Sequence, residues 1–426
     1  MSRAHTANSA ASAVAENGQR PSVDKAASPS TAGRVAPHAL FEPRSLSPVA
    51  SAHLDLIRGL AAWVVMWNHS RTLFFVSYDQ LASRSAALSL LYLVTGFGHE
   101  AVVVFFVLSG FLISSSVFSK QASGKWTWRD YGIDRLSRLW VVLIPGLVLG
   151  LFWDRLGSHL FGSTGIYSHP LEGFGAVIVR DHLGVGTFFG NLFFLQTICF
   201  PELGSNGPLW SLANEFWYYT LFPLALFAWI AWKRGALLTS CMCAVSFIAV
   251  ALFVGSPIAT SFSIWLMGTV LVFAYSKWRL QRTSSATLYA LASAFALCAL
   301  LAFERTRHLN ELRGDLAMGA VFTAFLFGVL QMDFGGRNLF YERLAQALAG
   351  FSYSLYVLHF PLLLFLRAKF APSDKWQPDV NHVAHWWMVG AGVLAYSWFI
   401  SIFTEGRTKA VRNWMRRMLP AFDGRT

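Results

Sequence analysis

The chain has 426 residues, of which 55% are hydrophobic and only 13% are charged. Soluble domains usually carry about 25% charged residues, so a soluble protein of this composition would expose too much apolar surface to water. The formal net charge of +12 is compatible with nucleic-acid binding, but the Lys and Arg residues stand in short segments between apolar runs instead of forming one basic surface. Composition therefore excludes a soluble multidomain protein, and we expect no nucleic-acid partner.

The first 50 residues are rich in Ala, Ser and Pro and contain no continuous apolar segment. Such a composition cannot bury enough apolar surface to fold, and it lacks the hydrophobic core of a cleavable signal peptide. We therefore expect residues 1–50 to form a disordered cytoplasmic tail.

From Leu54 onward, apolar segments long enough to cross a hydrocarbon layer of ~30 Å recur between short polar breaks. This pattern predicts an all-α integral membrane protein with about ten transmembrane helices in one bundle, and a transmembrane domain over residues 51–406. A re-entrant segment between Phe188 and Ile198 is an additional option. The expected spans are 54–76, 98–118, 137–157, 209–232, 236–255, 258–276, 285–303, 315–333, 350–367 and 384–404.

The distribution of positive charge predicts the orientation of the chain, because Lys and Arg are retained on the cytoplasmic side during insertion. Most of the 34 Lys and Arg residues lie in segments on the same side as the N-terminus if every expected span crosses the membrane. Both termini should then face the cytoplasm, with residues 407–426 as a basic cytoplasmic tail. The one long outside connection, residues 158–208, is of a length that is usually functional.

The cysteine and histidine spacing gives no sign of a metal site. The four cysteines lack metal-type spacing, and three of them stand inside apolar segments, where thiols behave as small hydrophobic groups. The three histidines of the long connection include no pair at i,i+4. We expect neither a metal ion nor a bound cofactor.

Ionisable residues within the expected spans are candidates for function, because a charge in hydrocarbon costs at least ~2.5 kcal/mol. Arg58 and His69 are eleven residues apart, close to three helical turns, and so share one face of the first helix. Glu215 lies at a similar predicted depth to His69, and His359 lies near the middle of another span. A histidine next to a carboxylate or a second histidine predicts a general base with an orienting partner. The sequence leaves open whether Glu215 or His359 orients His69.

Two further groups accompany these residues. Ser352, Tyr356 and His359 are spaced by four and three, so they share a helix face. Arg135 and Arg138 precede the third span on the predicted cytoplasmic side, and guanidinium groups bind phosphates through paired hydrogen bonds. These two arginines, with Lys120, Lys125 and Arg129 nearby, predict a site for a nucleotide-bearing donor, although positive charge on the cytoplasmic side is also expected from topology alone.

The same residues lie in motifs whose order resembles the bacterial acyltransferase 3 family of membrane O-acyltransferases. The resemblance covers about Leu54 to Glu405, nearly all of the chain outside its tails. In many members Gly-Val-Asp precedes two phenylalanines, whereas this chain has Ala101-Val102-Val103 after His99-Glu100, so no role of that Asp is transferred. The motifs are Arg58 and His69 with ten residues between them, Phe105 to Phe111 (FFVLSGF), Arg135-Leu136-Ser137-Arg138 before Pro145, Trp210-Ser211-Leu212 with Glu215 and Tyr218, and Gly350 to Tyr356 with His359.

The resemblance implies that Arg58 and His69 are needed for activity and that Arg135 and Arg138 belong to the cytoplasmic, donor side. It also implies a multi-pass protein of the bacterial inner membrane. The expected reaction transfers an acyl group, expected to be acetyl, from cytoplasmic acyl-CoA to a hydroxyl of an extracytoplasmic carbohydrate such as exopolysaccharide or O-antigen. A covalent acyl carrier at His69 or Ser109 is an alternative path. The predicted catalytic residues are His69, Arg58, Glu215 and His359, the donor-binding residues are Arg135 and Arg138, and the supporting residues are Ser109, Trp210, Ser211, Tyr353 and Tyr356.

Acyl-CoA is thus expected as a substrate, and the expected partners are membrane lipid, acyl-CoA and a glycan acceptor. The sequence gives no oligomeric state. The rival functions are a transporter or flippase of a lipid-linked sugar, in which buried ionisable residues would form a proton relay, and a membrane-embedded glycan polymerase or ligase. Transport is disfavoured because the two halves of the chain show no internal repeat and no paired Gly/Pro-broken helices.

Overall fold

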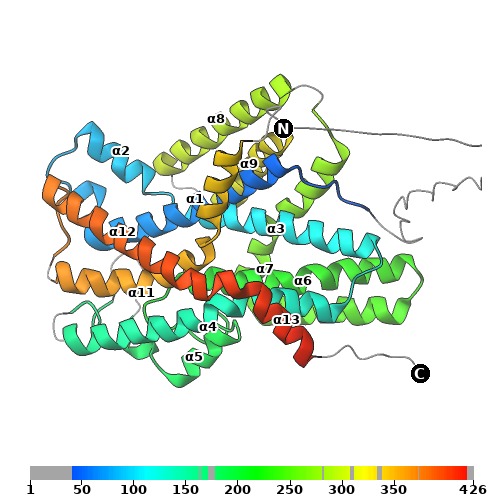
Figure 1. The fold of residues 1–426 in the computed structure, drawn as a ribbon, viewed down its shortest axis with the longest axis horizontal. Coiled ribbons are helices and arrows are strands. Elements are labelled where there is room, and N and C mark those ends of the chain that lie inside the picture. Colours follow the sequence, from blue (N-terminus) through cyan, green and yellow to red (C-terminus); the bar gives the residue numbers. More distant parts are fainter. Residues whose placement is uncertain are drawn as a thin grey trace, which may run out of the picture. The chain divides into compact units, whose positions relative to one another are not determined.

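A computed structural model of the chain describes residues 41–162, 165–170, 178–280, 283–307, 311–332, 338–372 and 374–419. Within these ranges the regular structure is helical (Figure 1), and only two isolated bridges occur outside the helices. The all-α prediction is confirmed. The α-helices are α1 (Pro48–Phe74), α2 (Ala86–Val94), α3 (Gly98–Ala122), α4 (Trp128–Phe161), α5 (Val185–Leu192), α6 (Leu209–Lys233), α7 (Leu237–Lys277), α8 (Thr283–Arg307), α9 (Glu311–Gln331), α10 (Leu339–Ala349), α11 (Ser352–Phe370), α12 (Val380–Phe403) and α13 (Thr408–Met418).

Each of the ten expected spans overlaps one of these helices, but fewer meet the length and hydropathy expected of a membrane span. Among the described residues, 7 helical segments do so, or up to 8 if the bent pair α10–α11 counts as one span. The lower number has two sources. The spans expected at 236–255 and 258–276 are the two halves of α7, and α6 carries polar residues such as Asn214 and Glu215 within its apolar sequence.

Two bends shape the bundle. Gly255 has φ 79° and ψ 170°, values outside the helical region that a residue with a Cβ rarely adopts, so α7 bends there ahead of Pro257. Helices α10 and α11 meet at an angle of 42°. The second bend begins α11 at Ser352 and aims its polar face toward α1 and α4, which both pack against it.

Helices α1 and α3 form the centre of the bundle. Helix α1 contacts α3, α10, α11 and α12, and α3 also packs along α7. At the α3–α7 crossing, a Cβ on Gly110 would overlap the carbonyl oxygen of Trp265, and one on Gly268 would overlap the backbone of α3. Small residues such as these two glycines let helix backbones approach closely in membranes. This contact fixes the position of Ser109, the residue just before Gly110.

Parts of both expected tails contact the bundle. Phe41 packs against Phe118 and Phe273, and the backbone N–H of Arg44 donates to Ser276 Oγ at 2.9 Å. Of the tail expected over residues 1–50, the structure thus describes residues 41–50, some of which contact the bundle; residues 1–40 lie outside the described part. At the other end, residues 408–418 of the expected basic tail form α13, which packs on α4.

The connection between α4 and α6 is tightly organised where the structure describes it. It contains α5 and ends in a segment that polar side chains hold in place. The buried carboxylate of Asp154 accepts hydrogen bonds from the backbone N–H of Ser205 at 2.8 Å and from its hydroxyl at 2.7 Å. The side chain of Asn206 donates to the carbonyl of Val357 on α11. These contacts anchor residues 203–208 against α4 and α11, where they form one wall of the site described next.

Candidate functional site

His69 lies in a cavity of about 370 Å³ between α1, α3, α11 and the segment before α6. We call it the histidine cavity. His69 reaches it from the face of α1 that also carries Val65 and Thr72, as the helical spacing requires. Its lining comprises Val65, Asn68, His69, Thr72, Gly98, His99, Val102, Glu202, Gly204, Ser205, Gly207, Pro208, Trp210, Tyr356 and Phe360.

The imidazole of His69 is paired with that of His359. Nδ1 of His69 lies 2.8 Å from Nε2 of His359, and Nδ1 of His359 lies 2.9 Å from the carbonyl oxygen of Leu355. A carbonyl only accepts, so Nδ1 of His359 must carry the proton, and Nε2 of a neutral His359 must then accept from His69. The chain of contacts consequently makes Nε2 the unprotonated nitrogen of a neutral His69.

A second, smaller cavity of about 110 Å³ contains the predicted arginines Arg58 and Arg138. We call it the arginine cavity. Helices α1, α3, α4, α6 and α11 enclose it. Arg58 forms an ion pair of 3.0 Å with Asp55, and Arg138 interacts electrostatically with Glu215 and Glu405. Its lining comprises Arg58, Val102, Phe105, Phe106, Leu108, Ser109, Leu112, Ile113, Arg138, Leu139, Ser211, Leu212, Glu215, Tyr219, Ser352, Tyr353 and Tyr356.

Glu215 lines the arginine cavity and is not the hydrogen-bond partner of His69. Its carboxylate accepts from Ser109 Oγ at 3.0 Å and from the hydroxyl of Tyr219 one turn further along α6. Of the two orienting partners that the sequence left open, the structure joins His359 to His69. Glu215 and His69 were predicted to lie at a similar depth in the membrane, but they are not in contact because their side chains line different cavities.

Tyr356 and Val102 border both cavities and form the wall between them. The hydroxyl of Tyr356 lies 2.6 Å from Ser211 Oγ and 3.2 Å from the carbonyl oxygen of Pro208. The ring of Phe105 packs edge-on against the ring of Tyr356, with centroids 5.8 Å apart. Hydrogen bonds and ring packing thus hold the tyrosine that separates the arginines from the histidine pair.

The remaining supporting residues also line these cavities. Tyr353 borders the arginine cavity and donates its hydroxyl to the carbonyl oxygen of Leu139 at 3.0 Å. Trp210 borders the histidine cavity, with its ring nearly parallel to that of His99 at a centroid distance of 6.3 Å. Apart from Arg135 and His359, the residues selected from the sequence therefore line two adjoining chambers.

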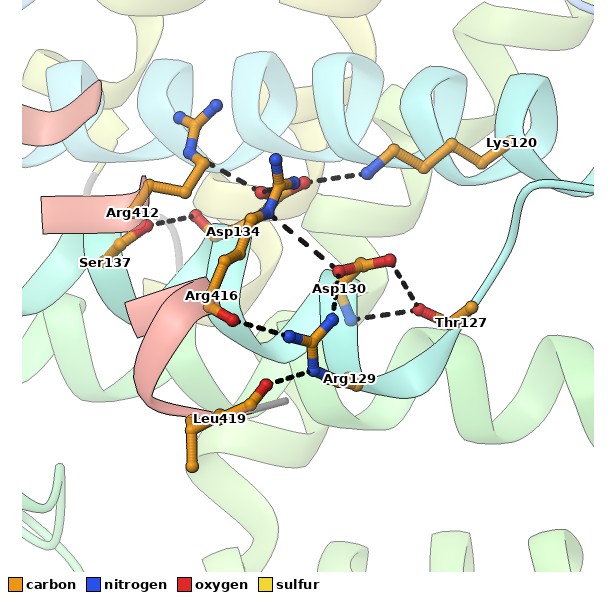
Figure 2. A network of polar contacts seen from close by, with 9 residues as sticks. All are labelled: Lys120, Thr127, Arg129, Asp130, Asp134, Ser137, Arg412, Arg416 and Leu419. Carbon is orange, nitrogen blue, oxygen red and sulfur yellow. Dashed lines mark hydrogen bonds and ion pairs between the residues drawn. The ribbon is translucent and has the colours of Figure 1, made fainter. Parts of the chain in front are cut away.

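The basic residues around Arg135 have mostly structural partners. Arg135 lies over the rings of Tyr131 and Tyr219, 5.8 and 5.7 Å from their centroids, and is not part of the arginine cavity lining. Lys120 and Arg129 hold α13 and its neighbours in place, as Figure 2 shows. Of the cations that the sequence grouped together, Arg138 lines the arginine cavity, and the others are absent from the linings of that cavity and of the histidine cavity.

The centre of the network in Figure 2 is the buried carboxylate of Asp134. It accepts from Lys120 Nζ of α3 at 2.7 Å and from Arg416 of α13 at 2.9 Å, and Arg412 lies 3.5 Å away. Three helices are thereby joined through one side chain. The backbone carbonyls of Arg416 and Leu419 accept from Arg129, which strengthens the same junction.

Replacing Asp134 with alanine should destabilise the junction strongly. Removing one partner of a buried ion pair leaves uncompensated charge and costs about 3–5 kcal/mol. We expect a clear drop in the melting temperature of the purified protein in detergent, with faster proteolysis of the C-terminal segment. The matched control is Asp130→Ala, because Asp130 is 35% exposed and such pairs contribute about 0–1 kcal/mol. Equal melting temperatures for the two variants would contradict this role of Asp134.

Two acidic residues, one lining the histidine cavity and one bonded to His99 of that lining, had no distinguishing pattern in the sequence. Glu202 lies in the segment before α6 and borders the histidine cavity, and burial raises the pKa of its carboxyl group while nearby His182 opposes the shift. Asp315 on α9 accepts from Nε2 of His99 at 2.7 Å. From the sequence alone, a glutamate in a loop and an aspartate near a helix end would be taken for solvated surface residues. Only the fold shows that these two lie at cavities.

Comparison with known protein families identifies a match. The sequence profile of the acyltransferase 3 family, described as an acyltransferase domain, matches residues 51–403. The matched range begins in α1 and ends in α12, so it contains every residue that lines the two cavities. No curated protein and no solved structure matches the chain.

Proposed function

Since the chain belongs to the acyltransferase 3 family and is a membrane acyltransferase, we propose that it moves an acetyl group from acetyl-CoA on the cytoplasmic side to a carbohydrate hydroxyl on the outer side. The acceptor is an exopolysaccharide, an O-antigen or a related glycan, and the enzyme acts in the bacterial inner membrane. The observation that carries this proposal is the junction at Tyr356 of two chambers, one lined by Arg58 and Arg138 and one lined by His69, whose imidazole is paired with His359.

The donor enters through the arginine cavity. A volume of about 110 Å³ is well below the ~300–1,000 Å³ of sites that enclose a whole small ligand. The cavity therefore receives only the narrow thioester end, while the phosphates of CoA remain near Arg135 and Arg138 at the cytoplasmic mouth. Arginine suits this position because its planar donors match phosphate oxygens in pairs.

The acceptor hydroxyl enters through the histidine cavity and meets the thioester beside Tyr356. Its oxygen attacks the thioester carbonyl carbon while its proton passes to Nε2 of His69. The carbon–sulfur bond then breaks, the sulfur leaves as thiolate, and the imidazolium returns the proton to it. The products are the acetyl ester and free CoA, and no other reactant is needed. His359 holds His69 in the tautomer that this step requires, because it accepts the Nδ1 proton.

The proposal predicts that release of free CoA depends on the acceptor. Purified protein in lipid nanodiscs should release CoA from acetyl-CoA, and transfer radiolabelled acetyl to the un-acylated surface polysaccharide isolated from cells that lack the protein. The control without polysaccharide should show only slow hydrolysis, since the attacking hydroxyl is missing. Acetyl-CoA that remains intact under both conditions would contradict the proposal and would favour transport.

A further inference from the structure

A third cavity, of about 610 Å³, adjoins the histidine cavity. We call it the aspartate cavity. The two share His99, Val102, Glu202 and Trp210, so they meet along one border. The aspartate cavity extends away from His69 toward α7 and α9, and Asp315 belongs to its lining alone. Its lining comprises His99, Val102, Val103, Phe106, Thr197, Glu202, Trp210, Asn214, Val254, Pro257, Ile258, Thr260, Ser261, Leu312 and Asp315.

The shared border and the adjoining lining of the aspartate cavity carry the side-chain chemistry that recognises a polyol. Trp210 offers a flat apolar surface and an indole N–H, and the C–H face of a sugar ring packs on such a surface. The carboxyl groups of Glu202 and Asp315 accept hydrogen bonds from hydroxyls, and the amide of Asn214 both donates and accepts. An aromatic surface beside several hydrogen-bonding groups fits a sugar, which has apolar C–H faces and hydroxyl groups along its edges.

The position of Asp315 is held by His99, a residue of the shared border. Its Oδ1 accepts from Nε2 of His99 at 2.7 Å, and the ring of His99 lies nearly parallel to that of Trp210. Residues of α3, α6 and α9 are thus organised together around the two cavities. The lining is preformed, which lowers the ordering cost of binding.

From these observations, and resting on the proposed function, we infer that the two cavities form one acceptor groove that binds an oligosaccharide across at least two sugar subsites. The sugar to be acylated occupies the histidine cavity, and a neighbouring unit of the same chain occupies the aspartate cavity. Each volume lies within the ~300–1,000 Å³ range of sites for small organic ligands, so the pair has room for more than one ring. The preferred substrate is then a polymer or oligomer rather than a single sugar.

The inference predicts a dependence on acceptor length that one residue controls. The un-acylated surface polysaccharide is cut by mild acid into fragments of one repeat and of several repeats, and kcat and KM are measured with acetyl-CoA in nanodiscs. In the Asp315→Asn variant, KM for the longer fragments should rise about tenfold, because a charged hydrogen-bond acceptor is lost. Values for the one-repeat fragment should stay within about twofold. Asn preserves the side-chain volume, so the fold is kept.

Two further variants sharpen the test. Glu202→Gln alters a residue that borders both cavities and should raise KM for both fragment sizes. Asp79→Asn changes an exposed aspartate of the short helix Tyr78–Gln80 and should change neither. The groove is overturned if Asp315→Asn affects both fragment sizes equally, if it affects neither, or if the wild type shows no preference for length. A wild type that acylates neither fragment would refute the proposed acceptor class, and the groove with it.

Discussion

Replacement of His69 with alanine is expected to lower the rate of acyl transfer by about 10²- to 10⁴-fold, the usual contribution of a positioned general base. The reason is geometric. Nδ1 of His69 contacts His359, and the ring borders the cavity through which we propose that the acceptor enters. Without the imidazole, the hydroxyl has no acceptor for its proton at the moment of attack. The measurement is transfer of radiolabelled acetyl to isolated polysaccharide in nanodiscs.

The matched control for this variant is His385→Ala. His385 is an exposed histidine on α12, and its ring contacts only the carbonyl of Asn381 among the hydrogen bonds described. We expect the control to retain wild-type activity and both variants to insert into the membrane at normal levels. Wild-type acetyl transfer by His69→Ala would show that another group takes the proton, and the mechanism would then be wrong.

Much of the fold followed from the sequence because membrane insertion depends on local properties. Apolar length predicts helices, and every expected span overlaps one. The number of spans was predicted less well, with ten expected and 7 or up to 8 found among the described residues. Gly255 and Pro257 kink α7, so that two expected spans lie in one long bent segment, and polar residues of α6 such as Glu215 lower the hydropathy of that helix and line the arginine cavity. The polar residues that make α6 a candidate for the site therefore also make it harder to recognise as a membrane span from its hydropathy.

The candidate site was only partly predictable, because helical spacing fixes which residues share a face and not which helix that face meets. Arg58 and His69 line cavities from one helix, as the spacing indicates. The pairing of His69 with His359 depends on how α11 packs against α1 after the bend at α10, which no local pattern specifies. Asp315 reaches His99 from a helix more than two hundred residues away in the chain, by tertiary packing alone.

The structural role of the basic residues Lys120 and Arg129 also depends on tertiary packing and could not be predicted from local sequence. In the sequence, a group of Lys and Arg residues near Arg135 and Arg138 suggests a phosphate-binding site. Lys120 and Arg129 instead neutralise Asp134 and Asp130, and Arg129 also caps the end of α13. Carboxylates spaced four apart on the same helix were the sequence signal for this, since Asp130 and Asp134 share the face that α13 covers. Charge that is already neutralised is less able to bind a second anion.

The second large effect is expected at His359, which acts through His69 and is therefore a positioning residue. Its Nε2 accepts the Nδ1 proton of His69, and its own Nδ1 donates to Leu355. In His359→Leu the acceptor is lost, so His69 is free to place its proton on Nε2, where it can no longer act as a base. We expect kcat to fall by about 10²- to 10⁴-fold, with KM for acetyl-CoA unchanged because the arginine cavity is intact.

A conservative variant separates this positioning role from simple packing. In His359→Gln, the amide oxygen lies near the position of the original Nε2 and can accept the same proton, so activity should recover to within about tenfold of wild type. Both variants fill the buried site with a side chain of similar size, and a loss caused by packing would affect them alike. Equal inactivity of the two would mean that the second imidazole itself carries a proton. Full activity of His359→Leu would mean that the tautomer of His69 is set elsewhere.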